Sequence, residues 1–195
     1  MTSSDVLDTA FSLQLAEATD LLLAAWREVA GRIRKLAAKH ERTWMVGRTH
    51  GVHAEPITLG VKLAGWHAEA LRNLERLARA RGLVAYGKIS GAVGTFAHFP
   101  PSFEDEVCRA LGLAPEPVST QVVPRDRYAD YFHALVLSAA AIERFAVEIR
   151  HLQRTEVLEA EEPFSDDQKG CSAMPHQRNP VLCENLCGLS RLIRS

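Results

Sequence analysis

Apolar side chains recur at helical spacing along most of the chain, and this pattern predicts a mainly helical protein. Between Asp5 and about His40, an apolar residue returns to the same helix face every three or four positions. The same spacing runs from about Thr58 to Ala85 and from Arg125 to about Glu159, and a shorter terminal helix begins at Val181. Long helices of this kind bury their apolar stripes against one another. We therefore expect an all-α fold, an elongated bundle of long antiparallel helices.

Three polar segments interrupt the helical pattern, and they carry the chemically reactive side chains. They are Gly47–Pro56, the glycine-rich residues 87–95, and residues 112–124. No alternation of apolar and polar residues typical of a strand extends beyond a few positions. We expect these segments to be loops.

Capping patterns predict where two helices begin. Ser3 or Ser4 is expected to cap the first long helix. Ser102 and Asp105 form a capping-box pattern for a short helix after Pro101.

The second and third of the long predicted helices are apolar over more than one face, which indicates more apolar surface than one bundle can bury. We expect the surplus to pair with other copies of the chain, as a homo-oligomer. The alternative is that these stripes only build the core of a monomer.

Composition limits the kinds of binding partner and the cellular locations that the chain is expected to have. Hydrophobic residues make up 47% of the 195 residues, charged residues 24%, and the net charge is −1. No basic surplus indicates nucleic acid, and no apolar run reaches the ~20 residues that cross a membrane. The first residues show no signal-like segment, and the four cysteines form no disulfide-like framework. These features favour the cytoplasm. Cys183 and Cys187 could be metal ligands, but small buried thiols are the preferred interpretation.

The segment Gly170–Pro180 is the most informative part of the chain. It reads GCSAMPHQRNP and lies between two apolar helical patterns. It resembles the signature loop of the fumarase/aspartase superfamily, G-S-S-x-M-P-x-K-x-N-P, and is most similar to the adenylosuccinate lyase family. Cys171 stands where the family has its catalytic serine, and Gln177 stands where it has a lysine. The resemblance implies substrate contacts from four residues of this loop: Ser172, Met174, Gln177 and Asn179.

The segment Gly47–Pro56 contains two histidines three residues apart. His50, His53 and Glu55 could be metal ligands, but without further ligands a structural or surface role is the preferred interpretation from the residues alone. Thr49-His50-Gly51-Val52-His53-Ala54-Glu55-Pro56 resembles a second motif of the same family. That resemblance implies that His50 is the general acid and that Thr49 binds a substrate carboxylate. An imidazole suits acid catalysis because its pKa lies near neutrality.

Three further regions carry the resemblance. Residues 2–9 are similar to T-S-x-D-V-x-D-T, which implies that Thr2 and Ser3 bind a substrate carboxylate; a helix cap is the simpler role. The regions around Lys88 and Gln121 imply further substrate contacts, with a solvated lysine and a loop glutamine as the alternatives. The resemblance also implies that Glu184 orients His50; otherwise Glu184 is a first-turn helix residue favoured by the helix dipole.

The implied chemistry is β-elimination without a cofactor or metal. A base in the signature loop, here Cys171, would remove a proton from the succinyl carbon, and an acid would protonate the departing nitrogen. Adenylosuccinate would yield fumarate and AMP, and the related succinylated ribotide would react in the same way. A thiol has a lower intrinsic pKa than a hydroxyl, but sulfur changes the reach of the base, and Gln177 lacks the lysine charge.

Residues 1–195 are expected to form one central helical-bundle domain, truncated at both ends relative to the family. We therefore expect a small-molecule purine nucleotide substrate, a tetramer in keeping with the family, and weak or absent activity in this chain. The alternative function is a non-catalytic helical oligomerisation module or pseudoenzyme.

Overall fold

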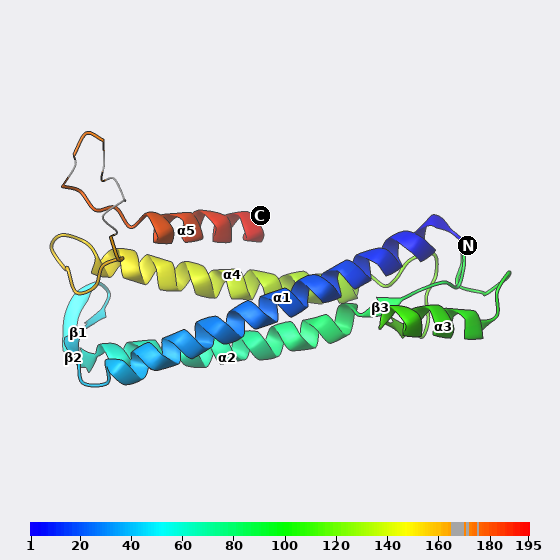
Figure 1. Ribbon diagram of the computed structural model, residues 1–195, viewed down its shortest axis with the longest axis horizontal. Coiled ribbons are helices and arrows are strands. Elements are labelled where there is room, and N and C mark those ends of the chain that lie inside the picture. Colours follow the sequence, from blue (N-terminus) through cyan, green and yellow to red (C-terminus); the bar gives the residue numbers. More distant parts are fainter. Residues whose placement is uncertain (165–169, 171, 175) are drawn as a thin grey trace. The chain divides into compact units, whose positions relative to one another are not determined.

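The structure is a computed structural model that describes residues 1–164, 170, 172–174 and 176–195. Five helices and four short strands occur in these residues (Figure 1). In chain order they are α1 (Ser3–Lys39), β1 (Trp44–Thr49), β2 (Val52–Thr58), α2 (Leu59–Val84), β3 (Tyr86–Gly87), α3 (Pro101–Leu111), β4 (Ala114–Pro115), α4 (Asp126–Leu152) and α5 (Val181–Arg194). The mainly helical fold predicted from the apolar pattern is confirmed.

The chain folds into two compact units. The first comprises residues 1–32 and 70–134, and the second comprises residues 33–69 and 135–195. The helices α1, α2 and α4 each contribute residues to both units. None of the helices in the described part of the chain is both long and apolar enough to span a membrane.

In the first unit, buried side chains of α1, α2 and α4 form the core. Hydroxyl contacts accompany this packing: Ser12 Oγ lies 3.1 Å from Tyr128 Oη, and Thr19 Oγ1 donates to Tyr131 Oη at 3.0 Å. The carboxylate of Asp20 pairs with Arg81 at 2.6 Å. Buried hydroxyls that find partners in this way do not incur the cost of an unsatisfied polar group. The core includes Ala16, Leu23, Trp26, Ala30, Leu77, Ala80, Val84 and Tyr131.

Two predicted helix caps are wrong. Thr2 precedes α1, its N–H donates to Asp5 Oδ2 at 2.7 Å, and its carbonyl accepts the Asp5 N–H at 3.1 Å. Ser3 and Ser4 therefore lie inside the helix. The helix α3 begins at Pro101, one residue before the predicted cap Ser102, because proline is well suited to the first helical position.

In the second unit, α2 and α4 run antiparallel. Lys62 pairs with Glu148, and Glu69, which lies later in α2, pairs with Arg144, which lies earlier in α4. Trp66 stacks on Phe145 with 4.6 Å between ring centroids. The helix α5 packs on α4 through its thiols; the cluster contains Cys183, Cys187, Ala146, Val147 and Ile149.

The segment predicted as the first loop is a β-hairpin. β1 and β2 pair antiparallel, with Thr49 opposite Val52 and an irregularity between Val46 and Arg48. Gly47 lies at this irregularity, where a side chain would not fit: an added Cβ would come within 2.3 Å of the Glu55 carbonyl oxygen. Gly47 and Pro56 interrupt the alternation of apolar and polar residues by which a strand is recognised. The sequence pattern therefore did not predict the hairpin.

The helix α4 ends at Leu152, seven residues before the predicted end. The chain then turns back, and the N–H of Glu159 donates to the Leu152 carbonyl at 3.0 Å. Arg48 on the hairpin binds the Glu159 carboxylate through two nitrogens, at 2.8 and 3.0 Å. A bidentate ion pair of this kind stabilises the turn against continuation of the helix.

Candidate active site

The N-terminus and the glycine-rich loop of the first unit are held together by a buried ion pair. The Lys88 ammonium binds Asp5 Oδ1 and donates to the Gly91 carbonyl at 2.7 Å, and both charged side chains are fully buried. The alternative of a solvated lysine is therefore wrong. Asp5 also accepts the N–H groups of Thr2 and Gly91, at 2.7 and 3.2 Å.

The surroundings of Asp5 favour its charged form. Burial alone would raise the pKa of this carboxyl group. The hydrogen bonds from Lys88, Thr2 and Gly91 and the Lys88 charge outweigh burial, and the pKa of Asp5 lies below its usual value. Thr2, predicted to bind substrate, is thus joined to the loop through a carboxylate that stays ionised.

The same loop packs closely against the segment that leads to Gln121. Ser90 Oγ and Ser119 Oγ are 2.7 Å apart. Gly94 has a φ of 77°, and a Cβ there would lie 2.0 Å from the Ser119 carbonyl oxygen. The segments that contain Thr2, Lys88 and Gln121 therefore lie close together in the first unit. The side chains of Ser3 and Gln121 are exposed.

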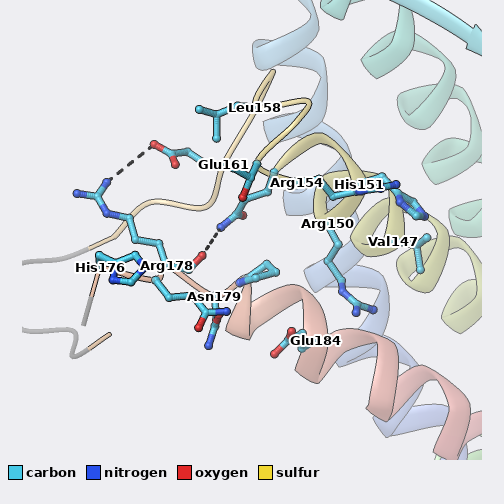
Figure 2. A pocket seen from close by; sticks show the side chains of 14 residues that line it. Val147, Arg150, His151, Arg154, Leu158, Glu161, His176, Arg178, Asn179 and Glu184 are labelled. Atoms are coloured by element: carbon cyan, nitrogen blue, oxygen red, sulfur yellow. Dashed lines mark hydrogen bonds and ion pairs between the residues drawn. The ribbon is translucent and has the colours of Figure 1, made fainter. Parts of the chain in front are cut away.

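In the second unit, a pocket of about 900 Å³ lies between the end of α4 and the start of α5 (Figure 2). Three residues predicted from the family resemblance line it: Gln177, Asn179 and Glu184. Its other charged and ionisable residues are mainly basic: Arg150, His151, Arg154, His176, Arg178 and Glu161.

The arginines of this pocket differ in their partners. Arg154 pairs with Glu156, and Arg178 lies 4.0 Å from the Glu161 carboxylate. Arg150 contacts the Cys187 sulfur at 3.8 Å. Clustered cations in a cleft attract anionic ligands. Arg150 and Arg154 could not be recognised from the sequence as site residues, because basic residues near a helix C-terminus are also favoured by the helix dipole alone.

His50 occupies the turn between β1 and β2. It is exposed, and with Gly51 it forms a two-residue turn, with φ values of 55° and 76°. Positive φ at both positions is the type I′ geometry of tight hairpins. Thr49, the predicted carboxylate ligand, is the last residue of β1.

The structure does not record the predicted pairing of His50 and Glu184. No hydrogen bond or ion pair joins them among the described residues, and His50 is not among the residues that line the pocket containing Glu184. A second pocket of about 410 Å³ is lined by the neighbours Arg48 and Gly51, and it shares His151 and Arg154 with the first. The roles of His50 and Glu184 stay predictions.

The remaining predicted residues of the signature segment differ in exposure, and one of them is not described. Cys171 lies outside the described residues. Ser172, Met174 and Gln177 are exposed, and Asn179 is half-buried. No group of three or more potential metal ligands occurs in the described part of the chain. Cys183 and Cys187 are buried free thiols, as the sequence predicted.

Comparison with solved structures defines the class of this fold. The chain matches the 3-carboxy-cis,cis-muconate lactonizing enzyme of Pseudomonas putida with a TM-score of 0.88 and 33% identity, over 99% of this chain and 44% of the other. The class II fumarase of Schistosoma mansoni matches with a TM-score of 0.89 over 99% of this chain and 46% of the other, at 21% identity, and shares the fold alone. The fold is that of the fumarase and lyase superfamily.

The sequence comparisons identify the family. A protein-family model described as lyase matches residues 1–194, and the chain belongs to that family. It is 58% identical over 195 residues to the adenylosuccinate lyase of Thermotoga maritima and 58% identical over 194 residues to that of Synechocystis. Each match covers 100% of this chain and 45% of the relative, so the chain spans about half the length of these proteins. The predicted resemblance is confirmed.

Proposed function

We propose that residues 1–195 form the central helical-bundle domain of a carbon–nitrogen lyase that releases fumarate from adenylosuccinate and from the related succinylated ribotide of purine biosynthesis. The observation that carries this proposal is the 58% identity to an adenylosuccinate lyase along the whole chain. The basic pocket beside Asn179 and Glu184 supports it, because the substrate is an anion.

The proposed reaction is an elimination that needs a base and an acid. Cys171, as the thiolate, removes the proton from the carbon next to a succinyl carboxylate, and the electron pair is delocalised into that carboxylate. The bond from carbon to nitrogen then breaks, and His50 protonates the departing nitrogen. Glu184 orients His50, whereas Thr2, Ser3 and Thr49 bind carboxylates.

Further contacts to the bound nucleotide belong to the same proposal. Lys88 supports the site through Asp5. The remaining substrate contacts are Gln121, Ser172, Met174, Gln177 and Asn179.

Two residues of the signature loop make weak activity the expected outcome. Cys171 replaces the family's serine, and Gln177 replaces a lysine whose charge would stabilise the dianionic intermediate. Loss of one such stabilising group costs about 3 kcal/mol, by analogy with oxyanion donors. The same two residues favour the second candidate function, a non-catalytic helical oligomerisation module or pseudoenzyme.

A hybrid enzyme tests the proposal. This chain replaces the matching residues of the Thermotoga maritima relative, and fumarate release from adenylosuccinate is measured by absorbance. Restoring Cys171→Ser and Gln177→Lys together is expected to raise the rate by at least ~10-fold, equivalent to ~1.4 kcal/mol. His50→Gln in the restored hybrid is expected to abolish turnover.

Two outcomes would contradict parts of the proposal. A folded, restored hybrid that releases no fumarate supports the non-catalytic function. An unrestored hybrid that turns over at ~10 per second, an ordinary enzymatic rate, shows that the thiol is a competent base and that the expected loss of activity is wrong.

The proposal extends to assembly and location. We infer a homo-oligomer, a tetramer, supported by the exposed leucines of α5. We infer a cytoplasmic protein, supported by three buried thiols that are not in disulfides, at Cys108, Cys183 and Cys187.

A further inference from the structure

The helix α5 begins without a capping side chain of its own. Pro180 occupies the N-cap position and makes no side-chain cap bond. The carboxylate of Glu162 supplies the cap instead: it accepts the N–H of Leu182 at 3.2 Å and that of Cys183 at 2.7 Å. A carboxylate at this place satisfies two free amides and interacts favourably with the helix dipole. The first turn of α5 is therefore tied to a residue about twenty positions earlier.

Gln153 completes the connection on the opposite side of Glu162. Its Oε1 accepts the N–H of Glu162 at 3.0 Å, and its Nε2 donates to the Arg178 carbonyl at 3.0 Å, the bond drawn near Arg178 in Figure 2. Gln153 follows the last residue of α4, and its own N–H donates to the Ile149 carbonyl at 2.9 Å. A primary amide is suited to this task because it offers one acceptor and donors on the same group.

We infer that Gln153 and Glu162 form a clamp that ties Glu162 and Arg178 to the end of α4, and that they are positioning residues for Asn179 and the start of α5. Residues 162 and 178 bind the same amide group, so one side chain sets their separation. Asn179 and Glu184, which line the basic pocket, lie directly beyond this point. The inference rests on the proposed function only where it concerns substrate.

Hydrogen exchange tests the clamp without any assay of activity. In the 195-residue chain, Gln153→Met removes both hydrogen bonds at nearly constant size. It is expected to speed exchange of the Leu182 and Cys183 amides about tenfold, although Gln153 contacts neither amide. Glu162→Gln is expected to have at least the same effect. Gln14→Met, an exposed glutamine of α1, is the matched control and should leave these amides unchanged.

The exchange result can overturn the inference directly. If Gln153→Met leaves both amides within about twofold of the parent while α2 stays protected, no clamp exists. Should Gln153→Met fail to fold, Gln153→Glu replaces it: this variant keeps an acceptor for the Glu162 N–H, but it places a charged acceptor in place of the donor that binds the Arg178 carbonyl. It must still speed exchange at Leu182 and Cys183, or the inference is wrong.

Kinetics of the restored hybrid test the positioning role. Gln153→Met is expected to raise KM about tenfold with a smaller change in kcat, since it displaces Asn179, a proposed substrate contact. Adding Glu162→Gln should cost little more, because both changes break one network. Losses that simply add, or a KM that stays at the parent value, would overturn the positioning role. If no hybrid releases fumarate, the proposed function fails, and the exchange experiment still decides whether the clamp exists.

Discussion

Two cysteine thiols lie in surroundings that suppress their reactivity. Burial raises the pKa of Cys108 to about 11. Burial, followed by the interaction with the Glu162 carboxylate, raises the pKa of Cys183 to about 12. The thiolate is the reactive form, so both groups should be nearly inert near neutral pH.

Alkylation measures this effect. We expect iodoacetamide at about pH 8 to modify Cys108 and Cys183 at least ~100-fold more slowly in the folded chain than in urea, because folding both shields the thiols and removes the thiolate. Peptide mapping by mass spectrometry reports each cysteine separately. Equal rates in folded and unfolded protein would contradict the burial of these thiols.

The buried pair of Asp5 and Lys88 makes stability depend on pH. The folded-state pKa of Asp5 lies below its unfolded value. The carboxylate therefore contributes stability above the unfolded pKa, and this contribution is lost as pH falls through the folded pKa. Removing Lys88 raises the pKa of Asp5 relative to the parent, because only the N–H groups of Thr2 and Gly91 then oppose the effect of burial.

We expect Lys88→Met to lower the free energy of unfolding by about 3–5 kcal/mol near pH 7, because it leaves a buried charge unpaired. The deficit should shrink toward about pH 4, as Asp5 takes up a proton. The double variant with Asp5→Asn should be milder than Lys88→Met alone. Urea unfolding at several pH values measures this, with the exposed Lys35→Met as control. A deficit that does not change with pH would argue against the ion pair.

At the scale of elements, the glycine-rich loop depends on a close approach of two backbones. Gly94 combines a φ of 77° with a Cβ position 2.0 Å from the Ser119 carbonyl oxygen. Gly31 is the opposite case, since it lies inside α1 and a Cβ there meets nothing within 4 Å. The two glycines therefore form a matched pair for the same substitution.

We expect Gly94→Ala to destabilise the first unit by about 2 kcal/mol or more, because alanine is strained at this φ and collides with the neighbouring loop. Gly31→Ala should stabilise the protein by about 0.5–1 kcal/mol, because glycine is unfavourable inside a helix. Chemical denaturation compares both variants with the parent. Equal effects of the two substitutions would show that the loops do not touch in solution.

For the whole molecule, exposed apolar residues predict self-association. On α5 they are Val181, Leu182, Leu186, Leu189, Leu192 and Ile193, and on α1 they include Val6, Leu7, Leu21 and Val29. Folded monomers rarely leave so much apolar surface in contact with water. A second copy of the chain would cover it.

Sedimentation velocity tests this prediction. We expect the chain to form oligomers at micromolar concentration, and Leu189→Lys with Leu192→Lys to shift the population toward monomer by placing charges in an apolar contact. Val118→Lys, at a highly exposed position outside the long helices, is the control. A folded monomer at these concentrations would contradict the prediction.

The helices were predictable because their pattern is local. The observed bounds of α1 and α2 lie within two residues of the predicted ones, and α5 begins at Val181 as expected. The end of α4 was not predictable, since the chain leaves the helix at Leu152 for contacts of Glu159 with the distant Arg48. The hairpin was not predicted for a similar reason. Gly47 and Pro56 interrupt the alternation of apolar and polar residues, and the strands form through hydrogen bonds across the turn.

The sequence alone determined the fold class and the family, and it named Gln177, Asn179 and Glu184, which the structure brings into one pocket. Only the tertiary structure decided that Lys88 is a buried partner of Asp5 and that Gln153 and Glu162 hold the start of α5. The reason is physical. Helical periodicity and short motifs depend on residues that are close in the sequence. The environment of a charge or an amide depends on residues that folding brings together from distant parts of the chain.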